Sequence, residues 1–204
     1  MKKNLEFFSK ALSLLPEVKE TLVPPKERQF FSKPLGKGDS VTIDFGKHLV
    51  GHLQVKMGYV NSHPDAPVWI RFSFAENLKE FEENVENYQG WICAAWGHQV
   101  HLHFDLILGE YTLPRRYSFR YVKIDILDIS SKFNLVIEDV MAIALSSADD
   151  SKLKPYHNVH KELEQIDHIA CHTLHDCKQI VFEDGPKRDR RLWMGDLRLK
   201  ALEN

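Results

Sequence analysis

The stretch from Glu183 to Asn204 holds the densest group of residues that could do chemistry. At about 100° per residue, Asp189, Trp193 and Asp196 fall on one stripe of a predicted helix. Asp184 stands on the turn just before that helix. Carboxylates bind sugar hydroxyls, an aromatic ring stacks on the apolar face of a sugar, and a protonated acid can protonate a leaving glycosidic oxygen. The stretch therefore predicts a sugar site.

Two questions about this stretch stay open at the level of the sequence. Clustered acids raise one another's pKa, whereas Arg188 and Arg190 lower the pKa of the acids beside them, and the residue types do not decide the balance. A purely structural interpretation also stands. In that interpretation Asp189 caps the helix, Trp193 belongs to the core and Asp196 forms an ion pair one turn further on.

The order and spacing of these residues resemble the signature of glycoside hydrolase family 78, the bacterial α-L-rhamnosidases. In this chain the members of the signature are Asp184, Pro186, Arg188, Asp189, Trp193 and Gly195-Asp196. The resemblance implies hydrolysis of terminal α-L-rhamnosides by an inverting acid/base mechanism, with Asp189 as the general acid. It also implies that the other charged residues of the signature, Asp184, Arg188 and Asp196, hold sugar hydroxyls and that Trp193 walls the pocket.

The chain also departs from the usual form of this signature. Gly185 stands where the family usually has Cys, Asp189 replaces the usual Glu, and Arg191-Leu192 replaces Leu-Gly. The family's general base is a Glu far downstream, and no residue of this chain matches it. We therefore expect the chain by itself to be an inactive N-terminal fragment of a glycosidase. The alternative is a non-catalytic, carbohydrate-binding β-sandwich module.

The elements ahead of this stretch repeat with a period of two, which is typical of strands with one buried face. Apolar residues occupy alternate positions in six segments: 41–45, 53–59, 68–74, 100–104, 122–126 and 135–145. Turn residues such as Gly46 and Gly109 separate them. Several such strands without helices between them predict an antiparallel β-sandwich. The acidic stretch 76–87 indicates a surface loop or a short helix.

The period changes to 3.6 after a polar segment at 146–157. Apolar residues from Leu163 to Val181 share one face and predict a helix over about 159–181. Asp184-Gly185-Pro186 ends it, and a second helix is expected from about 189 to the end of the chain. The resemblance implies that these are the first two helices of an (α/α)6 catalytic barrel, because the family has a β-sandwich ahead of such a barrel.

These patterns divide the chain into three parts and make its fold class mainly β. Residues 1–19 are expected to hold an amphipathic N-terminal helix, with Leu5, Phe8 and Leu12 at helical spacing. Residues 20–150 are the predicted β-sandwich. Residues 151–204 are the predicted start of the helical barrel, which the chain does not complete.

Composition excludes several other classes of protein. A net charge of −2 argues against a nucleic-acid partner, and no apolar run approaches the roughly 18 residues of a membrane-spanning helix. Three cysteines are an odd, sparse set that suits a reducing cytoplasm better than a disulfide framework. We expect a carbohydrate partner, no membrane partner, and self-association through barrel helices that lack their neighbours.

A second cluster of polar residues lies on the predicted helix over 159–181. His168, Cys171, His172 and His175 share one stripe of it, which could indicate zinc. That stripe lies opposite the apolar face, so a solvated polar face is the favoured interpretation. We expect no metal and no cofactor.

Overall fold

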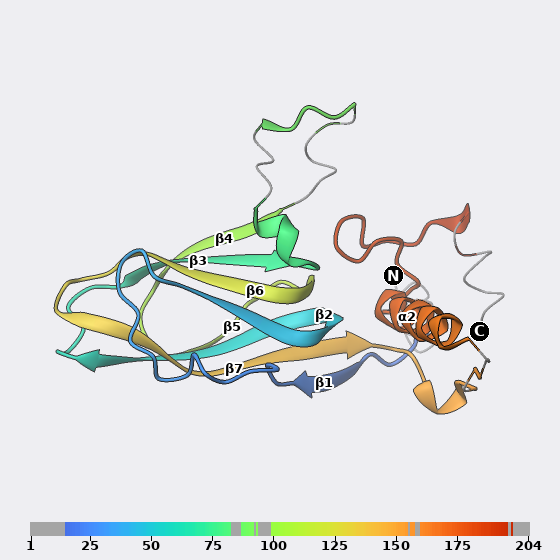
Figure 1. Cartoon of the computed structure of the whole chain (residues 1–204), viewed down its shortest axis with the longest axis horizontal. Coiled ribbons are helices and arrows are strands. Elements are labelled where there is room, and N and C mark those ends of the chain that lie inside the picture. Colours follow the sequence, from blue (N-terminus) through green and yellow to red (C-terminus); the bar gives the residue numbers. More distant parts are fainter. Residues whose placement is uncertain are drawn as a thin grey trace, which may run out of the picture. The chain divides into compact units, whose positions relative to one another are not determined.

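The computed structural model describes residues 15–82, 87–91, 93, 99–154, 156–157, 160–195 and 197. These residues form a mainly antiparallel β-structure followed by the α-helix α2 (Lys161–Cys177) (Figure 1). The chain divides into two compact units. One is residues 21–144, and the other joins the described residues up to Glu20 to those from Leu145 onward. No helix of the described residues is long and apolar enough to cross a membrane.

Seven strands of the described residues build the sheet, and their main pairings are antiparallel. They are β1 (Lys19–Val23), β2 (Ser40–Asn61), β3 (Val68–Ala75), β4 (Val100–Leu106), β5 (Glu110–Thr112), β6 (Tyr117–Asp128) and β7 (Phe133–Ser146). Their hydrogen-bonded order is β1-β7-β2-β6-β3-β4, and β5 pairs with β2 beside this path. Two short 3-10 helices, η1 (Leu78–Phe81) and η4 (Asp150–Lys152), lie in the connections.

The sheet folds into two layers at the middle of β2. The first half of β2 pairs with β6 and the second half pairs with β7, and Gly51 is the residue common to both pairings. A Cβ at Gly51 would collide with the backbone carbonyl of Ile143, so this crossing requires glycine. Figure 1 shows β3, β4 and β6 in one layer and β7 in the other. The predicted antiparallel sandwich agrees with this arrangement.

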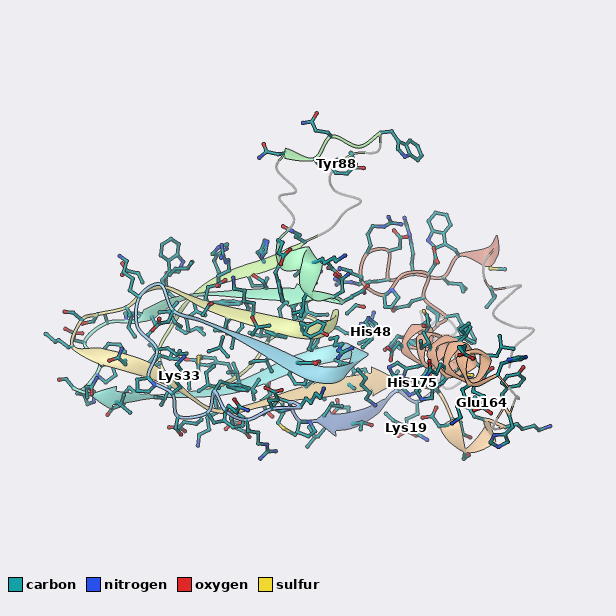
Figure 2. The ribbon with its side chains drawn as sticks, viewed as in Figure 1. Lys19, Lys33, His48, Tyr88, Glu164 and His175 are labelled. Atoms are coloured by element: carbon teal, nitrogen blue, oxygen red, sulfur yellow. The ribbon has the colours of Figure 1, made fainter. Side chains whose placement is uncertain are left out.

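Alternate side chains of the strands fill the space between the layers (Figure 2). In β2, Val41, Ile43 and Phe45 are buried while Thr42 between them is exposed. Phe119 of β6 is fully buried and packs edge-on against Phe45, with ring centroids 5.5 Å apart. Burying one such side chain contributes about 1.5–3 kcal/mol, so the period-two segments drive the collapse of this unit.

The sequence pattern located most strands but missed two features of the sheet. Segments 41–45 and 53–59 are parts of one strand, β2, which continues through an irregularity. The register of its pairing with β6 shifts between Asp44 and Leu49, and Gly46 within this stretch takes a left-handed φ of 80°. β1 and β5 were not predicted, since each is short and mostly exposed and carries no clear alternation.

The helix α2 spans Lys161–Cys177, four residues shorter at its C-terminal end than predicted. It ends there because Lys178 forms an antiparallel bridge with Phe182. Of the predicted apolar face, Cys177 is buried, whereas Leu163 and Ile166 are exposed, as is the neighbouring Ile169. The helix predicted in residues 1–19 lies almost wholly outside the described residues, which begin at Leu15.

The second predicted helix begins later than residue 189. Residues 186–189 form a turn, Asp184 bridges to Arg191, and helical backbone appears only from Met194. The reason is local, since Arg190 takes a left-handed φ of 51°, which ends any helical run through it. The barrel itself stays an expectation from the resemblance.

Candidate functional site

The signature folds as a closed loop between α2 and residue 194. Gly185 adopts a left-handed φ of 63°, a conformation that glycine takes without the steric cost of a Cβ. Its carbonyl oxygen accepts hydrogen bonds from the backbone N–H groups of Arg188 at 3.0 Å and Asp189 at 3.1 Å. The N–H of Asp184 donates to the carbonyl of Arg191 at 2.9 Å and closes the loop.

An ion pair between neighbouring residues dominates this loop. The Arg188 guanidinium donates to both carboxylate oxygens of Asp189, at 3.3 and 2.9 Å. Adjacent residues do not face each other on a helix, but the turn at 186–189 brings these two side chains together. The hydrogen bond to Arg188 and the charge of Arg188 lower the pKa of Asp189. The same hydrogen bond and the charges of Asp189 and Asp184 raise the pKa of Arg188.

The structure therefore decides the charge balance that the sequence left open. Arg188 lowers the pKa of Asp189, and so does the charge of Arg191. Arg190 is used differently from what the sequence suggested, because its guanidinium donates to the carbonyl oxygens of Pro186 at 3.2 Å and Lys187 at 3.3 Å. Asp189 is a carboxylate at neutral pH in this state of the loop.

Trp193 lies at the end of the loop, with 46% of its surface exposed. The Arg191 guanidinium sits 4.9 Å from the centre of its ring, a cation–π contact. The carbonyl of Trp193 accepts from the N–H of Leu197 at 3.0 Å and so starts the following helical turn. Trp193 is neither a core residue nor on one helix stripe with Asp189, which corrects both of those interpretations.

The five predicted site residues are thus placed unequally. Asp184, Arg188 and Asp189 share the loop, with the Arg between two acids, and Trp193 stands beside it. Asp196 lies outside the described residues. Arg191 is the site residue that sequence reasoning missed as a participant. Its bridge to Asp184, its contact with the Trp193 ring and its charge near Asp189 reveal it, and helical periodicity carries no signal of these contacts.

A set of hydrogen bonds holds the segment between α2 and the loop. The buried Gln179 side chain donates to the carbonyl oxygens of Leu145 at 2.6 Å and Asp176 at 3.0 Å. The Ser147 hydroxyl donates to the carbonyl of Gln179 at 2.6 Å. The N–H of Glu183 donates to the carbonyl of Cys177 at 2.8 Å. This network ties the start of the loop to the chain that leaves β7.

The loop carries groups that can bind a polyhydroxylated ligand. It combines two carboxylates as acceptors, a guanidinium as donor and an exposed indole ring for stacking, which are the groups that sugar recognition uses. It holds no partner that would keep Asp189 protonated, and a general acid needs that proton. Within the described residues the geometry therefore supports binding directly, whereas acid catalysis requires a change in the Arg188–Asp189 pair.

Comparison with solved structures finds rhamnosidases among the similar proteins. A rhamnosidase from Klebsiella oxytoca, solved with rhamnose bound, is 37% identical, with a TM-score of 0.83 over 97% of this chain. A family 78 rhamnosidase of Bacillus sp. GL1 is 18% identical, with a TM-score of 0.60 over 80% of this chain, and shows the same fold. The chain spans only 42% and 16% of those two proteins. We find no match among curated proteins.

The family is shown by the β-structure. Residues 16–144, which contain all of the strands except the last two residues of β7, match the model of the glycosyl hydrolase family 78 α-rhamnosidase N-terminal domain. This match is independent of the signature, which lies outside those residues. The sandwich, the fold of the Klebsiella relative and this family match agree, and the chain belongs to the N-terminal domain family of the glycoside hydrolase family 78 α-rhamnosidases.

Proposed function

We propose that this chain is the N-terminal part of a glycosidase that removes terminal α-L-rhamnose with inversion. The observation that supports it most is the loop at 184–191, where Arg188 forms an ion pair with Asp189 and the charge of Asp184 helps to raise the pKa of Arg188. The 37% identity to a rhamnosidase solved with rhamnose bound supports the same substrate class. In this proposal Asp189 is the general acid, Asp184, Arg188 and Asp196 hold sugar hydroxyls, and Trp193 walls the pocket.

The ion pair gives Asp189 a way to change its protonation state. Without sugar, Arg188 holds the carboxyl ionised. A sugar hydroxyl that accepts a hydrogen bond from Arg188 draws the guanidinium off Asp189, and the pKa of the carboxyl rises because its stabilising partner is lost. Burial of the carboxyl beneath the sugar raises the pKa further, so that Asp189 takes up from solvent the proton that the departing glycosidic oxygen needs. Binding of the correct substrate thus creates the acid.

The isolated chain is proposed to be inactive. Inversion needs a second carboxylate, roughly 6.5–9.5 Å from the acid, to activate water on the opposite face of the sugar. Asp184 and Asp189 belong to one closed loop and approach a ligand from one side. In this proposal the second carboxylate belongs to a longer enzyme that contains this chain, and the chain spans 42% of the Klebsiella relative.

The test uses the longer enzyme that contains this chain and its Asp189→Asn variant. Turnover of unactivated α-L-rhamnosides should fall by about 10²–10⁴-fold, which is the usual contribution of a general acid. Aryl rhamnosides with good leaving groups should lose much less, because their leaving oxygen needs little protonation.

Asp105→Asn serves as the matched control, since Asp105 is an exposed acid of β4 and its loss should leave both rates unchanged. An equal loss of rate for activated and unactivated substrates in Asp189→Asn would remove the acid role. Turnover by the isolated chain that disappears in Asp189→Asn would show that the site is complete without further residues.

A further inference from the structure

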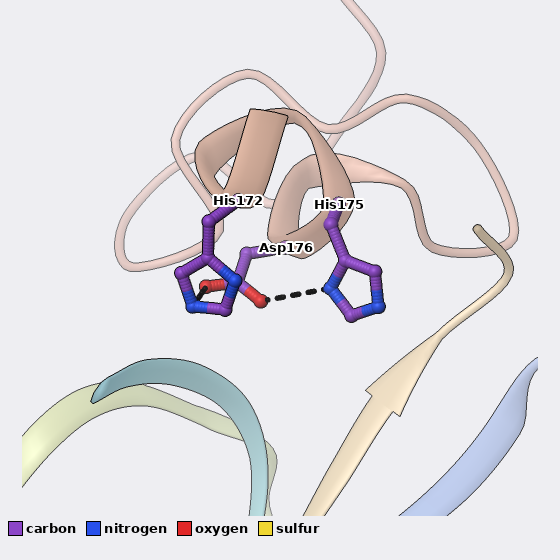
Figure 3. Close-up of side chains that lie close together, drawn as sticks. All are labelled: His172, His175 and Asp176. Carbon is purple, nitrogen blue, oxygen red and sulfur yellow. Dashed lines mark hydrogen bonds and ion pairs between the residues drawn. The ribbon is translucent and has the colours of Figure 1, made fainter. Parts of the chain in front are cut away.

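The C-terminal turn of α2 gathers a second set of polar side chains, separate from the signature. His172, His175 and Asp176 each offer one ligand atom, and these atoms all lie within 4.8 Å of one another. Figure 3 shows both imidazole rings directed at the carboxylate of Asp176 between them. Figure 2 places His175 on α2, like Glu164. The Asp176 side chain is 5% exposed and the two histidines are about a quarter exposed.

The spacing of these atoms is the observation that decides what the cluster can do. The His172 Nε2 lies 3.5 Å from one carboxylate oxygen of Asp176, and the His175 Nδ1 lies 3.3 Å from the other. The contact of His175 is a long hydrogen bond, since charge-assisted N–H···O bonds are typically about 2.7–2.9 Å. Two ligands bound to one zinc ion at about 2.0–2.1 Å in tetrahedral geometry stand about 3.3–3.4 Å apart. The contact of each histidine with the carboxylate is near this spacing, although the two contacts reach different oxygens of Asp176, and the three ligand atoms lie within 4.8 Å of one another.

We propose that His172, His175 and Asp176 bind a divalent transition-metal ion of the zinc type. Two imidazoles and one carboxylate suit zinc, cobalt or nickel, whereas calcium and magnesium prefer sites made of oxygen alone. Three protein ligands leave a further position for water or another group. This inference does not depend on the proposed glycosidase function.

The surroundings of the cluster hold it in place. The Nε2 of His175 faces the Asp150 carboxylate at 3.7 Å, which is the side on which a second-shell acid orients a metal-bound imidazole. The Ser146 hydroxyl donates to the His175 carbonyl at 2.7 Å. The Gln179 side chain donates to the Asp176 carbonyl at 3.0 Å. Both ligands are therefore fixed through their backbone, and a bound ion would brace the segment that leads to the signature loop.

The two other members of the predicted polar stripe do not belong to this set. Cys171 has its sulfur 4.0 Å from the carboxylate of Asp167, and His168 lines a shallow hollow with Ile169. The helical stripe predicted from the sequence therefore holds two of the ligands and misses Asp176, which is the next residue after His175 and one turn after His172.

The experiment titrates the untagged, chelator-treated chain with cobalt(II) and follows visible absorption, then repeats the titration with zinc by calorimetry. The expected result is one equivalent of metal, with the intense bands of four- or five-coordinate cobalt that zinc then removes. His172→Ala and His175→Ala should each weaken binding by more than the about 10–100-fold that loss of a second-shell partner costs. His168→Ala, on the same helix, should bind like the wild type.

Each outcome of this titration decides the question. The absence of saturable cobalt bands in the wild-type chain would overturn the proposal without any variant. Equal binding by His172→Ala and the wild type, with unchanged far-ultraviolet circular dichroism, would assign the metal to other histidines and overturn it as well. If a histidine variant unfolds, Asp150→Asn gives the second measurement: weaker binding, by about 10-fold or more, supports the site.

Discussion

At the residue scale, the proposed reaction depends on the proton of the Asp189 carboxyl group. Arg188 lowers the pKa of that group, and a general acid is active only below its pKa. In the longer enzyme, Arg188→Gln should therefore raise this pKa and move the alkaline limb of the kcat/KM profile to higher pH. The value of kcat/KM should fall at the same time, because a proposed sugar contact is lost.

The control for this change is Lys187→Gln. Lys187 neighbours Arg188, and the charges that lower the pKa of Asp189 are those of Arg188 and Arg191. The Lys187→Gln profile should keep the position of the wild-type limb. A limb that stays in place in Arg188→Gln would mean that another group limits the reaction at high pH.

A second residue pair sets part of the acid stability of the sandwich. Arg120 donates to both carboxylate oxygens of Asp44, at 2.9 and 3.0 Å, and this hydrogen bonding is the main reason that the pKa of Asp44 is lowered. A carboxyl with a lowered folded-state pKa stabilises the fold above its unfolded pKa of about 3.9, and that contribution is lost as the pH falls through the folded value.

Arg120→Gln should therefore lower the free energy of unfolding at neutral pH by less than about 1 kcal/mol, because the ion pair is partly exposed and screened by water. The difference from the wild type should shrink below about pH 4. Urea unfolding at a series of pH values measures it. The control is Lys47→Gln, which removes the charge of an exposed lysine in β2, the strand of Asp44. Its difference from the wild type should not change with pH. A constant difference at every pH would assign the effect of Arg120 to packing on Tyr121.

At the element scale, the sandwich depends on the crossing of β2 between its layers. Gly51 pairs with Tyr117 of β6 and with Ala144 of β7. Gly51→Ala places a Cβ against rigid backbone at Ile143 and Ala144, and relieving such overpacking typically costs about 1–3 kcal/mol. We expect the urea midpoint to fall by a corresponding amount.

The matched control for the crossing is Gly109→Ala. A Cβ there meets only the Tyr111 ring, at 3.8 Å, so its effect should stay within about 0.5 kcal/mol. If both variants unfold at the wild-type midpoint, the two halves of β2 can separate slightly and the crossing does not need glycine.

The elements also show which kinds of structure the sequence could predict. Strands with one face in the core repeat every two residues because burial selects the residue type, and β3, β4, β6 and β7 were found from that repeat. The signature loop has no such repeat. Its form depends on the left-handed Gly185 and Arg190 and on backbone hydrogen bonds, which residue types specify only weakly. A helical stripe was therefore predicted where a turn exists.

At the scale of the whole molecule, the helix α2 carries a group of exposed apolar side chains, unlike the buried faces of the strands. The strands bury most of their large aliphatic side chains, whereas α2 exposes Leu163, Ile166 and Ile169 by 42%, 62% and 63%. These residues recur every three positions and so share one side of the helix. The Klebsiella relative is more than twice as long as its matched part, so a longer enzyme has chain available to cover this face.

The isolated chain is expected to cover this face with a second copy of itself, because exposed contiguous apolar surface favours association. Its mass by analytical ultracentrifugation should rise with concentration. Ile166→Lys, which places a charge in the middle of the face, should return the chain to a monomer without lowering its unfolding midpoint. Ile107→Lys is the matched control, since Ile107 is 74% exposed and lies in the other compact unit, between β4 and β5. A wild-type chain that stays monomeric at every concentration, or equal effects of both variants, would show that α2 is not the contact.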